Sequence, residues 1–434
     1  EEAARFPLFF VPLRYFCSMS EKFLFSIPDY PDWKCHLLQW FDNQYPYFSF
    51  FQDNGITYPH DGFPNVIFAA NQCLDLAEAD RFYGKNELVG LVSYDYKNKV
   101  EKLTSNNPVP VDCPESLFFI PEIKIEIGKN NFTVFHPEGK RIGEEIRESI
   151  QLILSNPTVK VNPLTTQQDY FSAIKAIQNH IKEGDMYELN FCMAFTFESQ
   201  NWNPIIGFRD LMGKSPMPFS SLFKAKEKYL IGASPERFLK KAGDQLIAQP
   251  IKGTIKRGKD AAEDEILKNQ LLHSEKERAE NLMIVDLMRN DLSKISETGS
   301  VDVEELFGVY PFAKVHQMIS TVSSTIKKEV GLKEIFHATF PMGSMTGAPK
   351  IKCMELIEGY ENFQRGWFSG TLGHIQDNGD FDFNVVIRSI IFDKNTGKGY
   401  FAVGSAITYD ADAGYEYEEC LLKASAIMEV LEGK

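Results

Sequence analysis

The sequence lacks the features that define several classes of protein. None of its apolar runs approaches the length of a membrane span, and the formal net charge of −14 gives no overall positive field for nucleic acid or an anionic membrane. The seven cysteines are odd in number, widely spaced and without a C-x-x-C pair, which argues against a disulfide framework or a zinc site. We therefore expect a cytoplasmic protein that binds neither nucleic acid nor membranes. An anionic substrate would need a local cation.

Two short segments imitate known signals but do not match them. Residues 8–11 are apolar like the core of a signal sequence, but Pro7 and Pro12 flank them and no small-residue cleavage site follows. We interpret them as an edge strand. Residues 253–260 nearly match a phosphate-binding loop, except that Asp260 stands where a serine or threonine hydroxyl should hold magnesium. The sequence therefore predicts no nucleotide-binding loop.

The pattern of strands and helices predicts an α+β fold. Residues 1–160 are rich in aromatic residues and short strand-like alternations, including a hairpin over 123–135. Residues 161–434 show helical spacing over 167–182, 261–295 and 412–431, with further strands between. Because strands and helices mix without a regular βαβ order, we expect an α+β chain with an N-terminal region, 1–160, and a C-terminal region, 161–434.

Four glutamates stand in two pairs, each three residues apart. Glu277 and Glu280 belong to one predicted helix, and Glu416 and Glu419 belong to another. Residues at i and i+3 share a helix face, so two such faces brought together would offer the oxygen ligands that Mg²⁺ prefers. Acidic helix faces are more often simply solvated, and spacing alone favours that alternative.

Lys252 and Glu236 are candidates for covalent and acid–base chemistry. Lys252 follows an apolar strand beside Gly253, where burial would lower the pKa of its amine and make it a nucleophile; a surface lysine in a turn is the alternative. Glu236 begins a strand between apolar segments, where burial would let it hold a proton and act as a general acid. An ion pair with Arg237 is its alternative.

Two further features could bind carboxylates. Arg388 lies in Val-Val-Ile-Arg-Ser, a run apolar enough to imply a carboxylate partner from the protein or from a substrate. Residues 343–350, Gly-Ser-Met-Thr-Gly-Ala-Pro-Lys, lead into a predicted helix, so their backbone N–H groups and the Thr346 hydroxyl could hold a carboxylate. A tight turn that caps the helix explains this segment equally well.

Several stretches, taken in order, resemble the chorismate-utilising enzymes, a family that includes anthranilate, aminodeoxychorismate, isochorismate and salicylate synthases. They are Gly-Asp-Met-Tyr-Glu-Leu-Asn at 184–190, Pro-Ile-Lys-Gly-Thr at 250–254, the segment 278–291 that begins Arg-Ala-Glu-Asn, residues 343–350, and Glu-Tyr-Glu-Glu at 416–419. The resemblance is strong over 165–431 and looser before it. It implies a two-sheet β-sandwich flanked by helices.

The resemblance also implies a substrate and a metal. Chorismate would bind together with Mg²⁺, which Glu280 and Glu419 would hold, with Glu277 and Glu416 as accessory carboxylates. Arg388 would bind the enolpyruvyl carboxylate of chorismate, and Lys423 would lie near the ring carboxylate. The remaining implied pocket residues are Thr346, His316, Gly347 and Gly404.

The Pro-Ile-Lys-Gly-Thr segment separates the subfamilies. Anthranilate synthases have alanine where Lys252 stands, whereas aminodeoxychorismate synthases have a lysine that attacks carbon 2 of chorismate. That attack would expel the carbon 4 hydroxide with a proton from Glu236, ammonia would add at carbon 4, and Lys252 would leave. The resemblance thus implies production of 4-amino-4-deoxychorismate for p-aminobenzoate and folate biosynthesis. Anthranilate synthase component I and a non-catalytic chorismate-binding subunit are the alternatives.

Two positions depart from the pattern of the family. Glu188 stands where amino-transferring relatives usually have glutamine and water-using ones have a lysine base, so its own role is open. Phe368 replaces a tyrosine whose hydroxyl reaches a substrate carboxylate in many relatives. In addition, no cysteine lies in a Gly-x-Cys-x-Gly elbow. We therefore expect a separate glutamine amidotransferase subunit to supply the ammonia.

Overall fold

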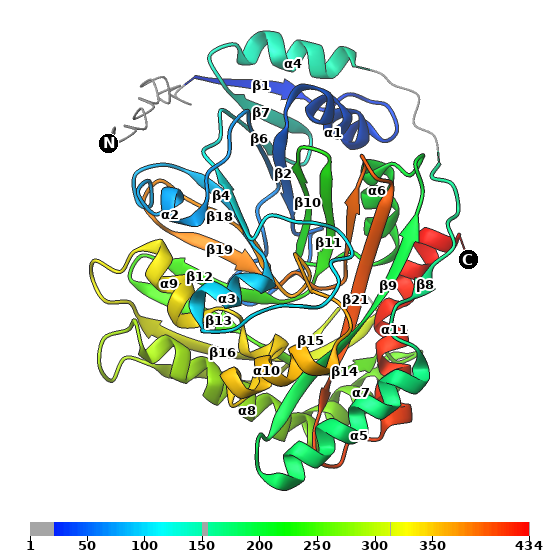
Figure 1. Ribbon diagram of the computed structural model, residues 1–434. Helices are drawn as coiled ribbons and strands as arrows, with labels where there is room; N and C mark the ends of the chain where they lie inside the picture. The colour runs from blue at the N-terminus through cyan, green and yellow to red at the C-terminus, as the bar shows by residue number, and fades with distance from the viewer. Residues whose placement is uncertain (1–20, 150–154, 313, 434) are drawn as a thin grey trace, which may run out of the picture.

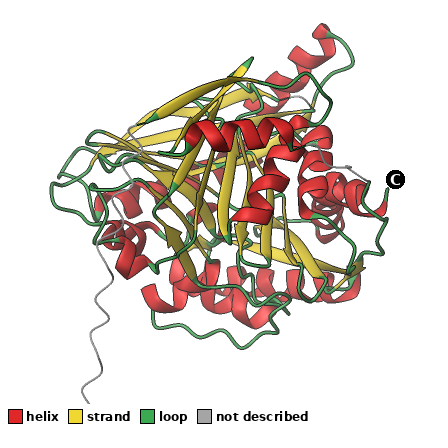
Figure 2. Cartoon of the chain, turned by 90° about the horizontal axis from the view of Figure 1, so that it is seen from above, coloured by secondary structure: helices red, strands yellow, loops and turns green. Residues whose placement is uncertain are grey.

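The computed structural model describes residues 21–149, 155–312 and 314–433, so the edge strand expected at 8–11 lies outside the described residues. The described chain forms two antiparallel sheets with helices around them, as Figures 1 and 2 show. This arrangement confirms the α+β class and the two-sheet architecture. Within the described ranges, no helix combines the length and the apolar character needed to cross a bilayer.

The larger sheet has twelve strands in the order β1-β7-β6-β3-β2-β10-β11-β20-β21-β9-β17, with β8 beside β9. Antiparallel pairing of β2 with β10 joins the N-terminal and C-terminal regions in one sheet. The strands are β1 Lys22–Ser26, β2 Tyr47–Gln52, β3 Val66–Ala70, β6 Ile123–Ile127, β7 Asn131–Phe135, β8 Asn162–Pro163, β9 Glu188–Glu198, β10 Phe219–Ala225, β11 Lys228–Ser234, β17 Gly347–Ala348, β20 Ser389–Asp393 and β21 Lys398–Ile407.

The smaller sheet has nine strands in the order β14-β16-β13-β12-β19-β18-β4-β5, with β15 beside β16. Here too the two regions mix, because β4 pairs with β18. The strands are β4 Leu88–Val92, β5 Ser116–Phe119, β12 Arg237–Ala242, β13 Gln245–Gln249, β14 Ile251–Lys256, β15 Asp302–Pro311, β16 Val315–Thr325, β18 Thr371–Ile375 and β19 Phe381–Asn384.

The helices pack around the sheets and cover their ends (Figure 2). They are α1 Trp33–Gln44, α2 Leu76–Ala79, α3 Lys97–Val100, α4 Gly139–Glu148, α5 Gln167–Glu183, α6 Pro204–Lys214, α7 Ala261–Leu272, α8 Glu275–Ser293, α9 Leu332–Thr339, α10 Lys350–Tyr360 and α11 Ala413–Glu432, with the 3₁₀ turns η1 Tyr94–Tyr96 and η2 Gly343–Met345. The described part of the N-terminal region ends in α4 and Ser149, and residues 150–154 lie outside the described ranges.

Helix α5 shows how local sequence sets an element. The Thr166 hydroxyl accepts a hydrogen bond from the Asp169 N–H at 3.1 Å and caps the first turn. Tyr170, Ile174 and Ile177 recur at helical spacing and are buried. Gly184, with φ of 84°, adopts the left-handed conformation that ends the helix. The helix predicted over 167–182 is therefore confirmed.

Strand β16 is an element that the sequence did not reveal. Its residues include Ser320, Thr321 and Ser323, and a run this polar hides the alternation that marks a strand. The structure buries these side chains and gives some of them polar partners, as in the 2.5 Å bond from the Ser320 hydroxyl to Asn281 Oδ1 on α8. Strand β14, which carries Lys252, pairs with β16.

A buried ion pair, Arg365–Glu361, ties several elements together. The Arg365 guanidinium donates to both Glu361 oxygens, at 2.6 and 2.9 Å. It also donates to the backbone oxygens of Asn190 on β9, at 3.0 Å, and Met345 in η2, at 2.7 Å. Glu361 in turn accepts the backbone N–H of Cys192 at 2.9 Å. Because both partners are fully buried, each depends on the other to balance its charge.

We predict that Arg365→Met lowers the free energy of unfolding by roughly 3–5 kcal/mol, because it leaves the Glu361 carboxylate buried without its partner. Urea unfolding measures this change. Arg289→Met is the matched control, since Arg289 pairs with Asp286 on the exposed face of α8 and its loss should cost at most about 1 kcal/mol. Equal losses in the two variants would show that the buried pair has no special role.

Candidate active site

A cavity lies where the two sheets meet helices α8 and α11. Asn190 of β9 and Gly404 of β21 come from the larger sheet, and Lys252 of β14 and Gln317 of β16 come from the smaller sheet. Of the residues that the sequence singled out, Lys252, Glu236, Arg388, Lys423, Gly404 and the four glutamates 277, 280, 416 and 419 all line this cavity. Phe368 lines it as well.

Lys252, which lines the cavity, makes an ion pair with Glu188 of β9. Its ammonium donates to Glu188 Oε1 at 2.6 Å, and the two residues are 9% and 0% exposed, so Lys252 is not a surface lysine. The pairing register of β14 and β16 shifts between Ile251 and Thr254, around Gly253. Gly253 has φ of 88°, and a Cβ there would lie 3.0 Å from a Glu277 oxygen. This explains why glycine follows the lysine.

The charges around Lys252 keep it protonated. Burial acts to lower the pKa of the amine, but the carboxylates of Glu188 and Glu280 outweigh it, and the pKa of Lys252 is raised above its ordinary value. We expected burial to lower the pKa of Lys252, and this expectation is wrong, because the net shift is upward. The physical reason is Glu188, which brings a negative charge where the subfamily pattern has a neutral glutamine.

Glu236 has the environment of an acid that holds its proton near neutral pH. Burial raises the pKa of its carboxyl to about 7, against the opposing effects of the Ser344 hydroxyl and the Lys252 ammonium. The alternative ion pair with Arg237 is not formed, because the Arg237 guanidinium pairs with Asp382 at 2.8 Å. Glu236 is therefore available to the cavity.

Arg388 has no carboxylate within ion-pair distance among the described residues of the protein. Burial lowers the pKa of its guanidinium to about 10, and the Glu236 carboxylate opposes this effect. The one side-chain hydrogen bond that it makes in the described chain is a weak contact of 3.8 Å from Nη1 to the Met217 sulfur. An arginine in this position is suited to an anionic ligand.

The four glutamates crowd one wall of the cavity. Burial raises the pKa of Glu280 to about 8, and it also raises the pKa values of Glu277 and Glu416. Lys276 partly compensates these acids, with its ammonium 3.0 Å from Glu416 Oε1 and 3.9 Å from Glu280 Oε1. Even so, Glu280 Oε1 is buried without a hydrogen-bond partner. The four acids of this wall therefore outnumber its two lysines, Lys276 and Lys423.

The donor set and this unpartnered oxygen fit a hard divalent cation. Mg²⁺ binds through one or two carboxylates together with water and substrate oxygens, and Glu280 on α8 and Glu419 on α11 provide the two carboxylates. The pKa of Glu419 is lowered, whereas the pKa values of the other three glutamates are raised. Burial acts to raise it, but Lys423, 2.7 Å away, outweighs burial. Lys423 also donates to the Gly404 backbone oxygen at 3.0 Å.

Three of the predicted pocket residues do not line the cavity. The Thr346 hydroxyl donates to the backbone oxygens of Met342 and Gly343, both at 3.2 Å, within the turn that precedes α10, and it does not cap that helix. Gly347 pairs with Leu189 of β9, and a Cβ on it would lie 2.2 Å from the Glu188 backbone oxygen. His316 is buried with Nε2 at 2.9 Å from Asp264 Oδ1.

Sequence reasoning missed several residues of the cavity: Lys276, Asn190, Gln317 and Ser344. The i,i+4 spacing of Lys276 and Glu280 on α8 was readable and would have found the lysine. Gln317 and Ser344 gave no comparable signal, because single amides and hydroxyls are common at buried turns and strands.

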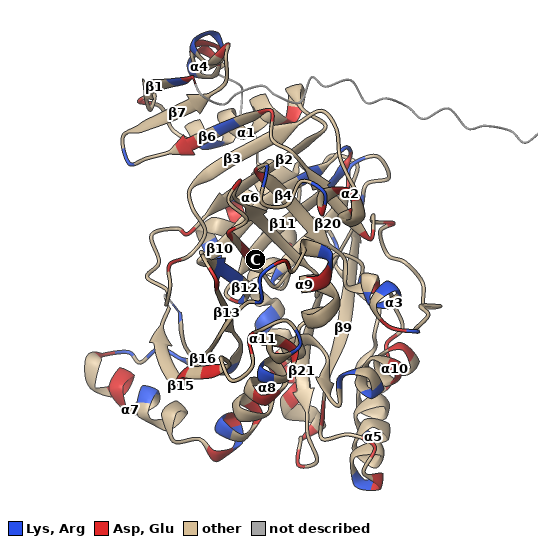
Figure 3. Ribbon diagram, turned by 90° about the vertical axis from the view of Figure 1, so that its left-hand side faces the viewer, with Lys and Arg blue, Asp and Glu red and all other residues tan. Residues whose placement is uncertain are grey.

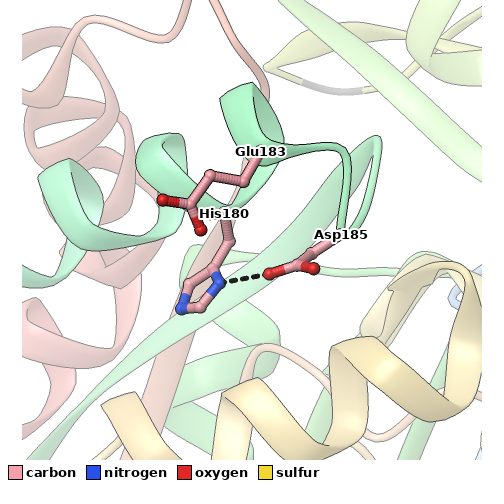
Figure 4. A group of neighbouring side chains, drawn as sticks. All are labelled: His180, Glu183 and Asp185. Atoms are coloured by element: carbon pink, nitrogen blue, oxygen red, sulfur yellow. Dashed lines mark hydrogen bonds and ion pairs between the residues drawn. The ribbon is translucent and has the colours of Figure 1, made fainter.

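A separate group of possible metal ligands lies outside this cavity, at the end of α5 (Figure 4). It consists of His180, Glu183 and Asp185. Both ring nitrogens of His180 are engaged, Nδ1 with Asp185 at 2.6 Å and Nε2 with the Tyr360 hydroxyl at 2.8 Å. Because this group lies outside the cavity, a substitution in it can serve as the control for metal binding in the cavity.

The chain belongs to the family of chorismate binding enzymes, whose profile matches residues 43–429. It is 40% identical to the aminodeoxychorismate synthase of Arabidopsis thaliana chloroplasts over 62% of this chain, and spans only 30% of that protein. It is 31% identical to aminodeoxychorismate synthase component 1 of Klebsiella aerogenes, over 79% of this chain and 77% of that protein. Among solved structures, anthranilate synthase component I of Streptococcus pneumoniae matches with a TM-score of 0.73 and 26% identity, over 88% of this chain and 90% of that chain.

We predict that Glu188→Gln lowers the pKa of Lys252, because burial then acts with less opposition from negative charge. Acylation of the amine across a pH series, followed by peptide mass spectrometry, should show half-modification of Lys252 at a lower pH than in the wild type. Modification of the exposed Lys140 should be the same in both proteins. An unchanged profile at Lys252 would contradict the role assigned to Glu188.

Proposed function

We propose that the protein converts chorismate and ammonia to 4-amino-4-deoxychorismate, through a covalent adduct on Lys252. The observation that supports this most is the position of Lys252 in one cavity with Glu236, whose pKa is about 7, and with Arg388, which has no protein carboxylate within ion-pair distance among the described residues. The proposal extends to p-aminobenzoate and folate biosynthesis as the use of the product.

We propose a role for each side chain that is consistent with its position in the cavity. Arg388 and Lys423 would hold the two substrate carboxylates, and Glu188, 2.6 Å from the Lys252 ammonium, would accept its proton. The free amine would attack carbon 2, the ring double bonds would shift, and the carbon 4 hydroxyl would leave as water with the proton of Glu236. Ammonia would then add at carbon 4, the double bonds would shift back, and the amine of Lys252 would leave.

The partner and the location are part of the same proposal. Ammonia would come from a separate glutamine amidotransferase subunit, which the name component 1 of the Klebsiella relative supports. A reducing, cytoplasmic location is supported by the free thiols of the described cysteines.

Incubation of the chain with chorismate, ammonium and Mg²⁺ tests the proposal, with the product identified by mass and fluorescence. We expect 4-amino-4-deoxychorismate from the wild type, no use of glutamine by the chain alone, and loss of most product in Lys252→Ala. The variant should still bind chorismate, because Arg388 and Lys423 remain. Anthranilate as the product would support the alternative, anthranilate synthase component I, and no product with intact chorismate binding would support a non-catalytic subunit.

The mechanism has its own measurement. With chorismate and no ammonia, intact-protein mass spectrometry of the wild type should show the covalent adduct, and Lys252→Ala should not. Nearly full activity in Lys252→Ala without any adduct would mean that ammonia attacks carbon 4 directly.

We also propose that Mg²⁺ binds between Glu280 and Glu419, with Glu277 and Glu416 as accessory acids, and supplies the positive charge that holds a substrate carboxylate. The unpartnered Glu280 oxygen and the raised pKa values of the surrounding acids support this site. The Thr346, His316 and Gly347 positions would act indirectly, through the backbone beside the cavity.

Added Mg²⁺ should raise the melting temperature of the wild type, because it binds the folded state, and Glu280→Gln should abolish the effect. The gain should increase from pH 6 to pH 9, since Glu280, with a pKa of about 8, must lose its proton to bind the ion. Glu183→Gln, in the His180 group, is the control and should keep the full gain. Turnover that resists a chelator would contradict the metal assignment.

A further inference from the structure

Two further hollows share walls with the active-site cavity. The first shares Arg388, Glu419 and Lys423 with the cavity. The second shares Lys276, Glu280 and Glu416 with it. Thr254 and Glu277 line all three spaces. The two hollows therefore adjoin the active-site cavity and are its candidate approaches from outside.

The two approaches carry opposite charge. The first has five cationic side chains and three glutamates, and we call it the basic mouth: Lys214, Lys256, Lys314, Arg388 and Lys423 against Glu277, Glu418 and Glu419. The second has one lysine and six acids, and we call it the acidic mouth: Lys276 against Glu275, Glu277, Glu280, Asp410, Asp412 and Glu416. Figure 3 shows residues of both signs along α7, α8 and α11, the helices in this part of the molecule.

Lys256 and Lys314 stand out in the basic mouth because neither has a carboxylate within ion-pair distance in the described part of the chain. By contrast, Lys214 pairs with Glu429 at 3.0 Å and Lys423 with Glu419 at 2.7 Å. The pairing of β14 with β16 sets Lys256 opposite Val315, the residue after Lys314, so the two exposed lysines are neighbours. With Arg388 behind them, they form a series of cations that ends in the cavity.

We propose that the basic mouth is the route by which a dicarboxylate substrate reaches the cavity, with Lys256 and Lys314 as its first contacts. The inference rests on the proposed function, because chorismate carries two carboxylates. A chain with a net charge of −14 repels a dianion, and the acidic mouth does so most strongly. Unpaired lysines within about a Debye length of the path, roughly 10 Å at 0.1 M salt, reverse that repulsion locally.

Charge reversal at both lysines tests the route. In Lys256→Glu/Lys314→Glu we expect KM for chorismate to rise about five- to tenfold at low ionic strength, with kcat within about twofold of the wild type. The difference should shrink as added salt screens the charges. Calorimetric titration of chorismate without ammonia should show the same loss of affinity.

A matched control separates local from overall charge. Lys129→Glu/Lys140→Glu changes two exposed lysines, in the β6–β7 turn and on α4, at the opposite end of the molecule from α8 (Figure 1). Each double variant removes two positive charges and adds two negative ones, so the net charge goes from −14 to −18 in both. The control should keep the KM of the wild type within about twofold.

The outcomes distinguish this inference from the proposed function. Aminated product with the same KM in both double variants, or an equal rise in both, overturns the basic mouth and leaves the function standing. Weaker chorismate binding in Lys256→Glu/Lys314→Glu alone, with no aminated product from the wild type, supports the mouth and overturns the function. A wild type that neither binds nor converts chorismate overturns both.

Discussion

The buried Arg365–Glu361 pair is the interaction on which the geometry of the site depends. It fixes the backbone of β9 at Asn190 and Cys192 and that of η2 at Met345, and both segments line or adjoin the cavity. Glu188 lies two residues before Asn190 on the same strand. Its ion pair with Lys252 then reaches from the larger sheet to the smaller one. The Arg365–Glu361 pair therefore determines the position of the Lys252–Glu188 pair, which joins the two sheets beside the cavity.

The cavity has an acidic wall and a separate arginine, and the described residues do not fully balance the charge of either. Burial, with a smaller contribution from neighbouring acids, raises the pKa of Glu280 to about 8, and one of its oxygens has no hydrogen-bond partner. Arg388 has no protein carboxylate within ion-pair distance among the described residues. Burying either sign alone is costly, so such groups usually mark a place where a ligand completes the balance. A dicarboxylate together with a divalent cation has the charges that satisfy both walls. This match between the ligand charges and the two sides of the cavity supports the proposal that the substrate and Mg²⁺ bind together.

The sequence predicted those parts of the fold and site that rest on short-range patterns. The α5 helix, the β6–β7 hairpin and the i,i+3 glutamates of α8 and α11 follow from periodicity, and the structure has them at the expected residues. Strand β16 escaped because its polar residues find their partners across the fold. Lys276 could have been found from its i,i+4 spacing to Glu280, whereas Ser344 escaped because only tertiary packing brings it beside Glu236. The same limit applies to Lys252, because the local sequence favours a surface lysine in a turn and its charged partner lies 64 residues away.

That distant partner changes how the site separates one reaction from another. A neutral glutamine at position 188 would leave burial as a stronger influence on Lys252, and the amine would lose its proton more easily. With Glu188 in place, the ammonium is retained, and the nucleophile that we propose would form only when its proton passes to the carboxylate 2.6 Å away. The second oxygen of Glu188 is buried without a hydrogen-bond partner, so proton transfer would remove two charges from a buried pair. The lysine that marks the subfamily and the glutamate that departs from it therefore act as one unit, and neither can be interpreted alone.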